Sequence, residues 1–199
     1  STGTRLRYNL IHDIESRTYG GWGMYTDEGS TNILIENNIA YNTKCGGFHQ
    51  HYGRDNIVRN NILAYARDMQ LARSRLESHV SFVFERNIVL FRQGDLWHGN
   101  WAGTNAVLRQ NLYFDETGRP FVCRHTPAPK KKFSFKAWQK LGFDTDSIVA
   151  NPRFADPHHG DFRLAKNSPA FRIGFQPFDL STVGPREEFR RDPASPPVT

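Results

Sequence analysis

The sequence predicts an all-β fold: a parallel β-helix, or β-solenoid, followed by a short C-terminal helix and a capping segment. Two observations favour this fold. A five-residue frame recurs through residues 1–115, and the segments between its copies are short β-branched runs punctuated by Gly and Asn, without a helical period. A repeat of about two dozen residues, built from strands and tight turns, is typical of coils that stack on one another.

The repeated frame consists of an apolar residue, two polar residues, an Asn and an apolar residue. Its copies are Leu6–Leu10, Ile35–Ile39, Val58–Ile62, Phe84–Ile88 and Leu108–Leu112. Successive marker asparagines are 29, 23, 26 and 24 residues apart: Asn9, Asn38, Asn61, Asn87 and Asn111. Because stacked coils repeat at about 4.8 Å, equivalent positions fall in columns. We therefore expect these asparagines to form a structural ladder inside a turn, amide bonded to amide.

Three segments follow from this pattern: coils over residues 1–115, an extension and cap over 116–184, and a flexible tail over 185–199. Ser134–Leu141 is expected to be a short amphipathic helix, capped by Ser134 and closed by Gly142, with Phe135, Trp138 and Leu141 on one face. Asp161–Leu164 is expected to be a strand that, with this helix, seals the C-terminal end. No comparable cap precedes the first coil, which predicts that further coils lie upstream.

Composition narrows the function classes. The 199 residues include 26 Lys and Arg against 20 Asp and Glu, a formal charge of +6, without a nucleic-acid-binding signature. Because this signature is missing, we expect no nucleic-acid partner. No run of about 18 apolar residues occurs, so we expect no membrane-spanning helix. The two cysteines, Cys45 and Cys123, form neither a disulfide framework nor a zinc motif, and a single bridge stays open.

Two neighbouring coils align without gaps. Gly23–Gly29 lies over Gly47–Gly53, and an Asn-Ile pair follows each segment at the same distance. This alignment places Tyr25 beside His49 and Asp27 beside His51. On the strand that follows, counting back from the marker Asn places Arg75 beside His49 and Glu77 beside His51. If the three extra residues of that coil instead follow the strand, Arg73 or Ser74 takes the place and Glu77 drops out.

The aligned columns form one polar face with functional chemistry. In the last coil the same count adds Trp101, with His98 just before it. Asp27 and Glu77 are then roughly 9–10 Å apart along the stack, a spacing suited to acid and base catalysis of glycoside hydrolysis. We expect Asp27, Glu77 and His51 to be catalytic. The expected substrate-binding residues are Tyr25, Glu28, His49, Arg73, Arg75, His98 and Trp101. His49 and His51 point the same way and can ligate zinc, yet nothing in the spacing demands a metal, and we expect none.

Three stretches carry a family resemblance: Gly21–Ser30 (GWGMYTDEGS), Gly46–Gly53 (GFHQHYG after the first Gly) and Arg73–His79 (RSRLESH). They resemble right-handed parallel β-helix proteins of the pectate-lyase-like superfamily, nearest to glycoside hydrolase family 141. The resemblance covers roughly residues 5–184. It implies hydrolysis of glycosidic bonds in plant or algal polysaccharides, without a cofactor, by a secreted or periplasmic protein.

Two other functions stay open at this point. A polysaccharide lyase on the same scaffold is expected to depend on calcium, with Arg73 or Arg75 as the base. A non-catalytic carbohydrate-binding solenoid would use the same polar face without turnover. In all three cases the partner is a polysaccharide or oligosaccharide.

Overall fold

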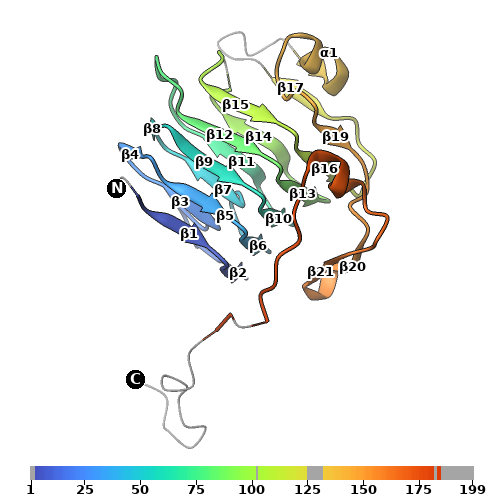
Figure 1. Cartoon of the computed structure of the whole chain (residues 1–199). Coiled ribbons are helices and arrows are strands. Elements are labelled where there is room, and N and C mark those ends of the chain that lie inside the picture. Colours follow the sequence, from blue (N-terminus) through green and yellow to red (C-terminus); the bar gives the residue numbers. More distant parts are fainter. Residues whose placement is uncertain (1–2, 102, 125–131, 182, 185–199) are drawn as a thin grey trace, which may run out of the picture.

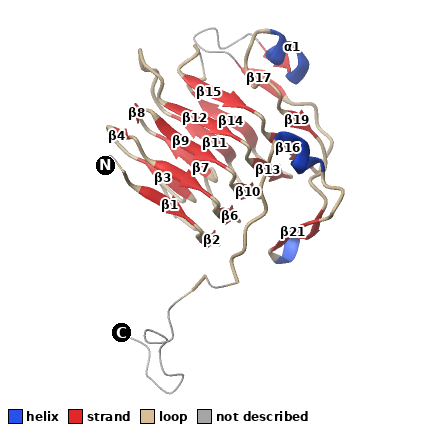
Figure 2. Ribbon diagram, viewed as in Figure 1, coloured by secondary structure: helices blue, strands red, loops and turns tan. Residues whose placement is uncertain are grey.

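The computed structural model describes residues 3–101, 103–124, 132–181 and 183–184, and it shows a parallel β-solenoid of about four turns (Figure 1). Three parallel sheets run along the stack, and each of the first four coils contributes one short strand to each sheet in turn. The few helices lie in the C-terminal part (Figure 2). The predicted fold class is therefore confirmed.

Each of the three sheets is a stack of strands from successive coils. In stacking order, sheet A contains β1 (Arg5–Arg7), β5 (Leu34–Glu36), β9 (Asn56–Arg59), β12 (Phe82–Glu85) and β15 (Ala106–Arg109). Sheet B contains β2 (Leu10–His12), β6 (Ile39–Tyr41), β10 (Ile62–Ala64), β13 (Ile88–Phe91), β16 (Leu112–Asp115) and β19 (Ile148–Val149). Sheet C contains β3 (Met24–Thr26), β7 (Phe48–Gln50), β11 (Met69–Arg73) and β14 (Asp95–Gly99).

Smaller elements complete the chain. A parallel pair, β4 (Ser30–Thr31) and β8 (Gly53–Arg54), lies beside sheet C, and two antiparallel pairs follow the coils: β17 (Val122–Arg124) with β18 (Lys132–Ser134), and β20 (Phe154–Asp156) with β21 (Asp161–Leu164). The helices are α1 (Phe135–Lys140) and two 3-10 turns, η1 (Pro157–His159) and η2 (Pro169–Ile173). None of the helices in the described part of the chain has the length and hydropathy needed to cross a membrane.

The predicted asparagine ladder is confirmed at the corner between sheets A and B. Each side-chain amide donates to the amide oxygen of the next coil, at 2.8, 2.9, 3.0 and 3.3 Å for the pairs Asn9–Asn38, Asn38–Asn61, Asn61–Asn87 and Asn87–Asn111. The residue before each ladder Asn has a positive φ: Tyr8, Asn37, Asn60, Arg86 and Gln110. The corner therefore needs a left-handed residue and then a side chain that hydrogen-bonds along the stack.

A serine takes the next place in the ladder column. Leu112 pairs with Ile148, so Ser147 stands in register with Asn111, and the backbone N–H of Asn111 donates to Ser147 Oγ at 2.8 Å. The Ser147 hydroxyl donates to Asp144 Oδ1 at 2.5 Å, and the Tyr113 hydroxyl donates to the same oxygen at 3.1 Å. Burial raises the pKa of Asp144 to about 6 despite these donors.

Asp144 makes stability depend on pH. The carboxyl holds its proton more tightly in the folded state than at its ordinary pKa of 3.8. Stability is therefore greatest below that value and falls by about 3 kcal/mol as the pH rises to about 6. We expect Asp144→Asn to remove this fall, measured by urea unfolding on both sides of the interval. Asp146→Asn, an exposed neighbour also at positive φ, is the matched control; an equal effect of both variants contradicts the assignment.

The helix and the strand predicted after the coils both form, but only the helix covers the end of the stack. Ser134 caps α1 by accepting from the Ala137 N–H at 3.3 Å. Phe135 packs against the last coil and Trp138 is buried. The prediction that Leu141 shares their face is wrong: Leu141 is 52% exposed, because α1 ends before it.

The remaining C-terminal segment lies along the outside of sheet B rather than on the end of the stack. Phe162 of β21 and Phe175 are buried against the outer side chains of that sheet. Asn60 holds the segment through two backbone bonds to Gln176, each 2.7 Å long. The predicted role of Asp161–Leu164 in sealing the end is therefore wrong. The predicted tail over 185–199 lies outside the described residues.

The interior between the three sheets is filled by aliphatic side chains together with a group of aromatic ones. Phe48, Phe82 and Phe84 have no solvent exposure, and their rings pack edge-on or stacked at centroid distances of 5.5 and 6.3 Å. Both cysteines are free: Cys45 is half-buried and Cys123 is buried. This packed interior fixes the strands of sheet C, whose outer face carries the predicted site.

Candidate functional site

The first two strands of sheet C bring four predicted site residues together. Tyr25 of β3 pairs directly with His49 of β7, as the sequence predicts. Both strands end one residue later, so Asp27 and His51 stand side by side just beyond them. Met24 and Phe48, which alternate with the outward pair, are buried in the interior.

Asp27 receives two hydrogen bonds at one oxygen. The Tyr25 hydroxyl donates to Oδ1 at 2.8 Å, and His51 Nδ1 lies 3.2 Å from the same atom. These bonds, led by the one from Tyr25, hold the pKa of Asp27 below its ordinary value. Burial and the neighbouring carboxylate raise the pKa of Tyr25, so its hydroxyl stays protonated as a donor. Asp27 is thus an exposed, ionised carboxylate with a fixed orientation.

Glu28 also reaches this face. The sequence predicts that it faces the other way unless the strand ends first, and β3 does end at Thr26. Its Oε1 lies 3.9 Å from His51 Nδ1, and its Oε2 accepts from the Tyr52 hydroxyl at 3.2 Å. The guanidinium of Arg75 lies 4.9 Å from the centre of the Tyr52 ring. His51 therefore stands between two carboxylates, Asp27 and Glu28.

Glu77 does not join the column, so its predicted pairing with Asp27 there is wrong. Strand β11 pairs with β7 through Ala72 and His49, and Arg73 and Gln50, which puts the extra residues of this coil after the strand. Glu77 lies in the following turn, where it accepts from the Gly53 N–H at 3.0 and 3.1 Å and from the Ser81 hydroxyl at 2.6 Å. Its side chain is only 12% exposed. Glu77 thus closes a turn.

Ser74 takes the place beside His51 that the alternative register allowed. Arg75 then falls one position beyond it, where it stacks on Tyr52 rather than lying beside His49. Arg73 points inward, is 1% exposed, and donates to the Ser81 hydroxyl at 3.0 Å. Its guanidinium is therefore withdrawn from the outer face, although the residue is among those that line the cavity described below.

Of the two residues predicted from the last coil, His98 lies on the outer face of sheet C and Trp101 lies in the interior. His98 of β14 pairs with Ala72, in the same outward column as Tyr25 and His49. Trp101 packs against Phe82 in the interior and is 5% exposed, while its indole N–H donates to the His98 carbonyl at 2.9 Å. The predicted role of Trp101 in stacking on sugar is wrong, because Gly99 ends the strand earlier than the count assumed.

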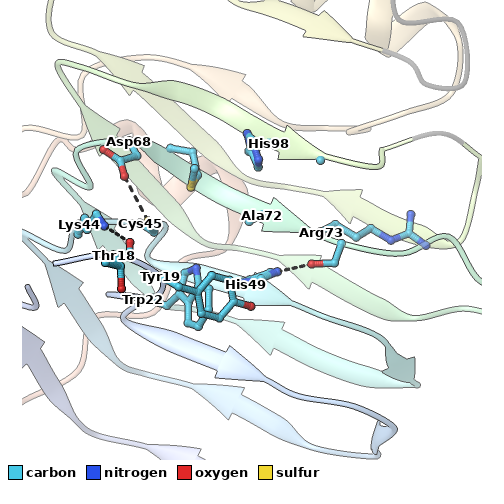
Figure 3. A pocket seen from close by; sticks show the side chains of 14 residues that line it. Thr18, Tyr19, Trp22, Lys44, Cys45, His49, Asp68, Ala72, Arg73 and His98 are labelled. Carbon is cyan, nitrogen blue, oxygen red and sulfur yellow. Dashed lines mark hydrogen bonds between the residues drawn. The ribbon is translucent and has the colours of Figure 1, made fainter. Parts of the chain in front are cut away.

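A cavity of about 470 Å³ lies on this face (Figure 3). Its lining includes Tyr19, Trp22, His49, Met69, Ser74 and His98. The Trp22 ring stacks on Tyr25 at 4.5 Å between centroids and 18° between planes, and it lies 4.8 Å from the His49 ring. Trp22 therefore joins the cavity to the cluster of Tyr25, Asp27 and His51.

Sequence reasoning missed Tyr19 and Trp22 as members of the site. They lie just before β3, and in the next coil the place of Trp22 is taken by Gly46, so the aligned columns show no repeated aromatic residue there. The available signal was local: two aromatic residues beside Gly20 and Gly21, just before a strand with functional side chains. Both glycines have positive φ values, 101° and 88°, which turn this segment toward the strand.

The hydrogen bond from Tyr25 can be tested directly. Replacing Tyr25 by phenylalanine removes the donor that most strongly lowers the pKa of Asp27, so this pKa is expected to rise toward 3.8. If catalysis requires the ionised Asp27 carboxylate, then on acidification the activity of Tyr25→Phe is expected to be lost at a higher pH than the activity of the wild type. NMR titration of the Asp27 carboxyl carbon measures the change. Tyr52→Phe, which removes a donor to Glu28 instead, is the control; an unmoved pKa in Tyr25→Phe contradicts the assignment.

Within the described residues, no group of three or more His, Cys, Asp or Glu side chains is placed to hold a metal ion. Comparison of the chain with protein-family models, with curated proteins and with solved structures finds no significant match.

Proposed function

We propose that this protein is a glycoside hydrolase that binds a polysaccharide along the outer face of sheet C and cleaves it at Asp27. The observation that carries the proposal is the hydrogen-bonded group of Tyr25, Asp27 and His51 beside a cavity walled by Trp22. The resemblance to glycoside hydrolase family 141 supports the same reaction class. Secretion or periplasmic location belongs to this proposal, since such polymers lie outside the cell.

Asp27 acts as the base or nucleophile. Its lowered pKa keeps it ionised at neutral pH, and its side chain is 67% exposed, so that a water molecule or a sugar carbon can reach it. Its partner carboxyl is Glu28 rather than Glu77. Both Asp27 and Glu28 lie within 3.9 Å of His51 Nδ1, a span compatible with the separations of about 5–9.5 Å found between glycosidase carboxyls.

Sugar rings bind to the aromatic side chains of this face. The flat apolar sides of pyranose rings stack on aromatic rings, and Trp22 and Tyr19 line the cavity next to Tyr25. On the far side of Asp27, Tyr52 and Arg75 add an aromatic ring and a hydrogen-bond donor. A polymer lying across these residues places one linkage at Asp27.

The test is product analysis on plant and algal polysaccharides, which follows new reducing ends. We expect Asp27→Asn to lower turnover by about 100-fold to 10,000-fold, with little change in melting temperature because the carboxyl is exposed. Asp55→Asn changes an exposed carboxyl in a turn outside the face and is the matched control. Equal activity of Asp27→Asn and the wild type removes Asp27 from the reaction.

The same assay separates the other two functions. A lyase yields unsaturated products that absorb ultraviolet light, and a binding solenoid yields no products while retaining affinity. The burial of Arg73 leaves the exposed Arg75 as the candidate base of a lyase, so the absorbance of the products decides between elimination and hydrolysis.

A further inference from the structure

A second reactive pair lies on the same face, apart from the carboxylates. His49 Nε2 is 2.7 Å from Ser74 Oγ, and both residues line the cavity of about 470 Å³. Figure 3 labels His49, and the dashed line from its ring marks this bond. The spacing is that of a serine nucleophile and its general base, about 2.6–3.2 Å. The pair joins two coils, since His49 is on β7 and Ser74 directly follows β11.

Packing fixes the orientation of His49. Its ring lies 4.8 Å from the Trp22 ring and 5.0 Å from the Tyr25 ring, and the residue is 6% exposed. Nδ1 is buried and has no hydrogen-bond partner among the described residues, so Ser74 is the polar contact of this imidazole. Burial, with the nearby His51 and His98, lowers the pKa of His49 to about 4. The imidazole is therefore a neutral base at physiological pH.

We propose that Ser74 and His49 form an acyl-ester hydrolase site that removes small acyl groups from carbohydrate hydroxyls. Ser74 Oγ attacks the ester carbonyl while its proton passes to His49 Nε2. The C–O bond to the sugar breaks, and the sugar oxygen takes that proton and leaves as a free hydroxyl. Water then attacks the acyl-serine by the same proton route, which releases the carboxylic acid and restores Ser74.

The cavity suits this class of substrate. Tyr19, Trp22 and Met69 form an apolar wall for a short acyl chain, and the volume admits such a group together with part of a sugar ring. His98 lines the same cavity and would supply an N–H donor for a carbonyl oxygen that gains negative charge. Ester removal next to a glycoside-binding surface would act on an acylated polymer.

The first experiment labels the wild-type protein with diisopropyl fluorophosphate, which forms an O–P bond with a reactive serine as fluoride leaves. Peptide mass mapping is expected to place the adduct on Ser74, with Ser78, an exposed hydroxyl in the same turn, unmodified. An adduct elsewhere, or none at Ser74, overturns the proposal without depending on whether any variant folds.

The second experiment follows release of acetate from acetylated xylan and of nitrophenol from p-nitrophenyl acetate. Ser74→Ala and His49→Gln are each expected to lower kcat/KM by at least about 100-fold, whereas Ser78→Ala matches the wild type. Asp27→Asn is expected to lose glycoside hydrolysis and to keep ester hydrolysis, so that failure of the esterase proposal can be told apart from failure of the glycosidase proposal. Unchanged acetate release by Ser74→Ala, with its fold verified by circular dichroism, overturns the assignment.

Discussion

Replacing Asn61 by alanine is expected to lower the free energy of unfolding by about 3–5 kcal/mol. The buried Asn61 amide oxygen accepts from the backbone and side-chain N–H groups of Asn38, at 3.0 and 2.9 Å. Its amide nitrogen donates to the carbonyls of Ile35 and Arg59 and to Asn87 Oδ1. Alanine leaves several of these groups buried without partners. The neighbouring coils cannot move together to restore the lost bonds, because each is held in place by the rest of the stack.

Urea unfolding of Asn61→Ala measures the loss. Asn167→Ala is the matched control, because Asn167 is exposed and its bond from Arg153 uses the backbone carbonyl. The control is expected to stay within about 0.5 kcal/mol of the wild type. A similarly small change in Asn61→Ala would mean that packing of the interior, without the Asn ladder, is enough to stabilise the corner between sheets A and B.

Replacing Gly99 by alanine is expected to cost about 3–5 kcal/mol and to open the cavity on sheet C. Gly99 has a φ of 90°, and an added Cβ would stand 2.1 Å from the carbonyl oxygen of Arg73 on the paired strand. Strand β14 would have to move away from β11, which breaks the register that positions His98.

Gly118→Ala separates the two causes of that loss. Gly118 has a φ of 70° with nothing within 4 Å of an added Cβ, so it carries the backbone strain without the collision. We expect this control to cost about 1–2 kcal/mol. Equal melting temperatures for the two variants would show that the approach of β14 to β11 imposes no constraint on side-chain size.

The coil repeat and the ladder could be predicted because each depends on residues close together in sequence. An Asn that follows a left-handed residue has few alternatives to bonding along the stack, and the frame around Asn38 or Asn61 repeats that arrangement locally. The first two site columns were predictable for the same reason, since Gly23–Gly29 and Gly47–Gly53 have equal length and equivalent glycines.

The third site column could not be predicted, because its register depends on where three extra residues are placed. Sequence alone does not distinguish a longer turn before β11 from a longer turn after it. The structure places them after it, since Leu71 must fill the interior beside Phe48 and Arg73 bonds to Ser81. As a result, Ser74 takes the place expected for Glu77, and Glu77 lies in the following turn. The register of β14 also places Trp101 beyond the column, where it packs inward.

The C-terminal part was predictable as elements but not as positions. Ser134 and Gly142 mark the helix limits locally. Whether a following strand lies over an end or along a side depends on contacts distant in sequence, such as Asn60 with Gln176. The outer face of sheet B offers apolar side chains that the last segment covers, and this decided the location of β21.

The serine at the end of the ladder has a consequence for self-association. An Asn column is a template that can extend: each amide presents both a donor and an acceptor, so an open end can recruit another coil, including one from another molecule. Ser147 has a single proton to give, and it gives that proton to Asp144, an acceptor. The hydrogen-bond chain therefore terminates inside the molecule at this end. At this end of the column a buried acid with a pKa of about 6 therefore stands where a further Asn would offer both a donor and an acceptor.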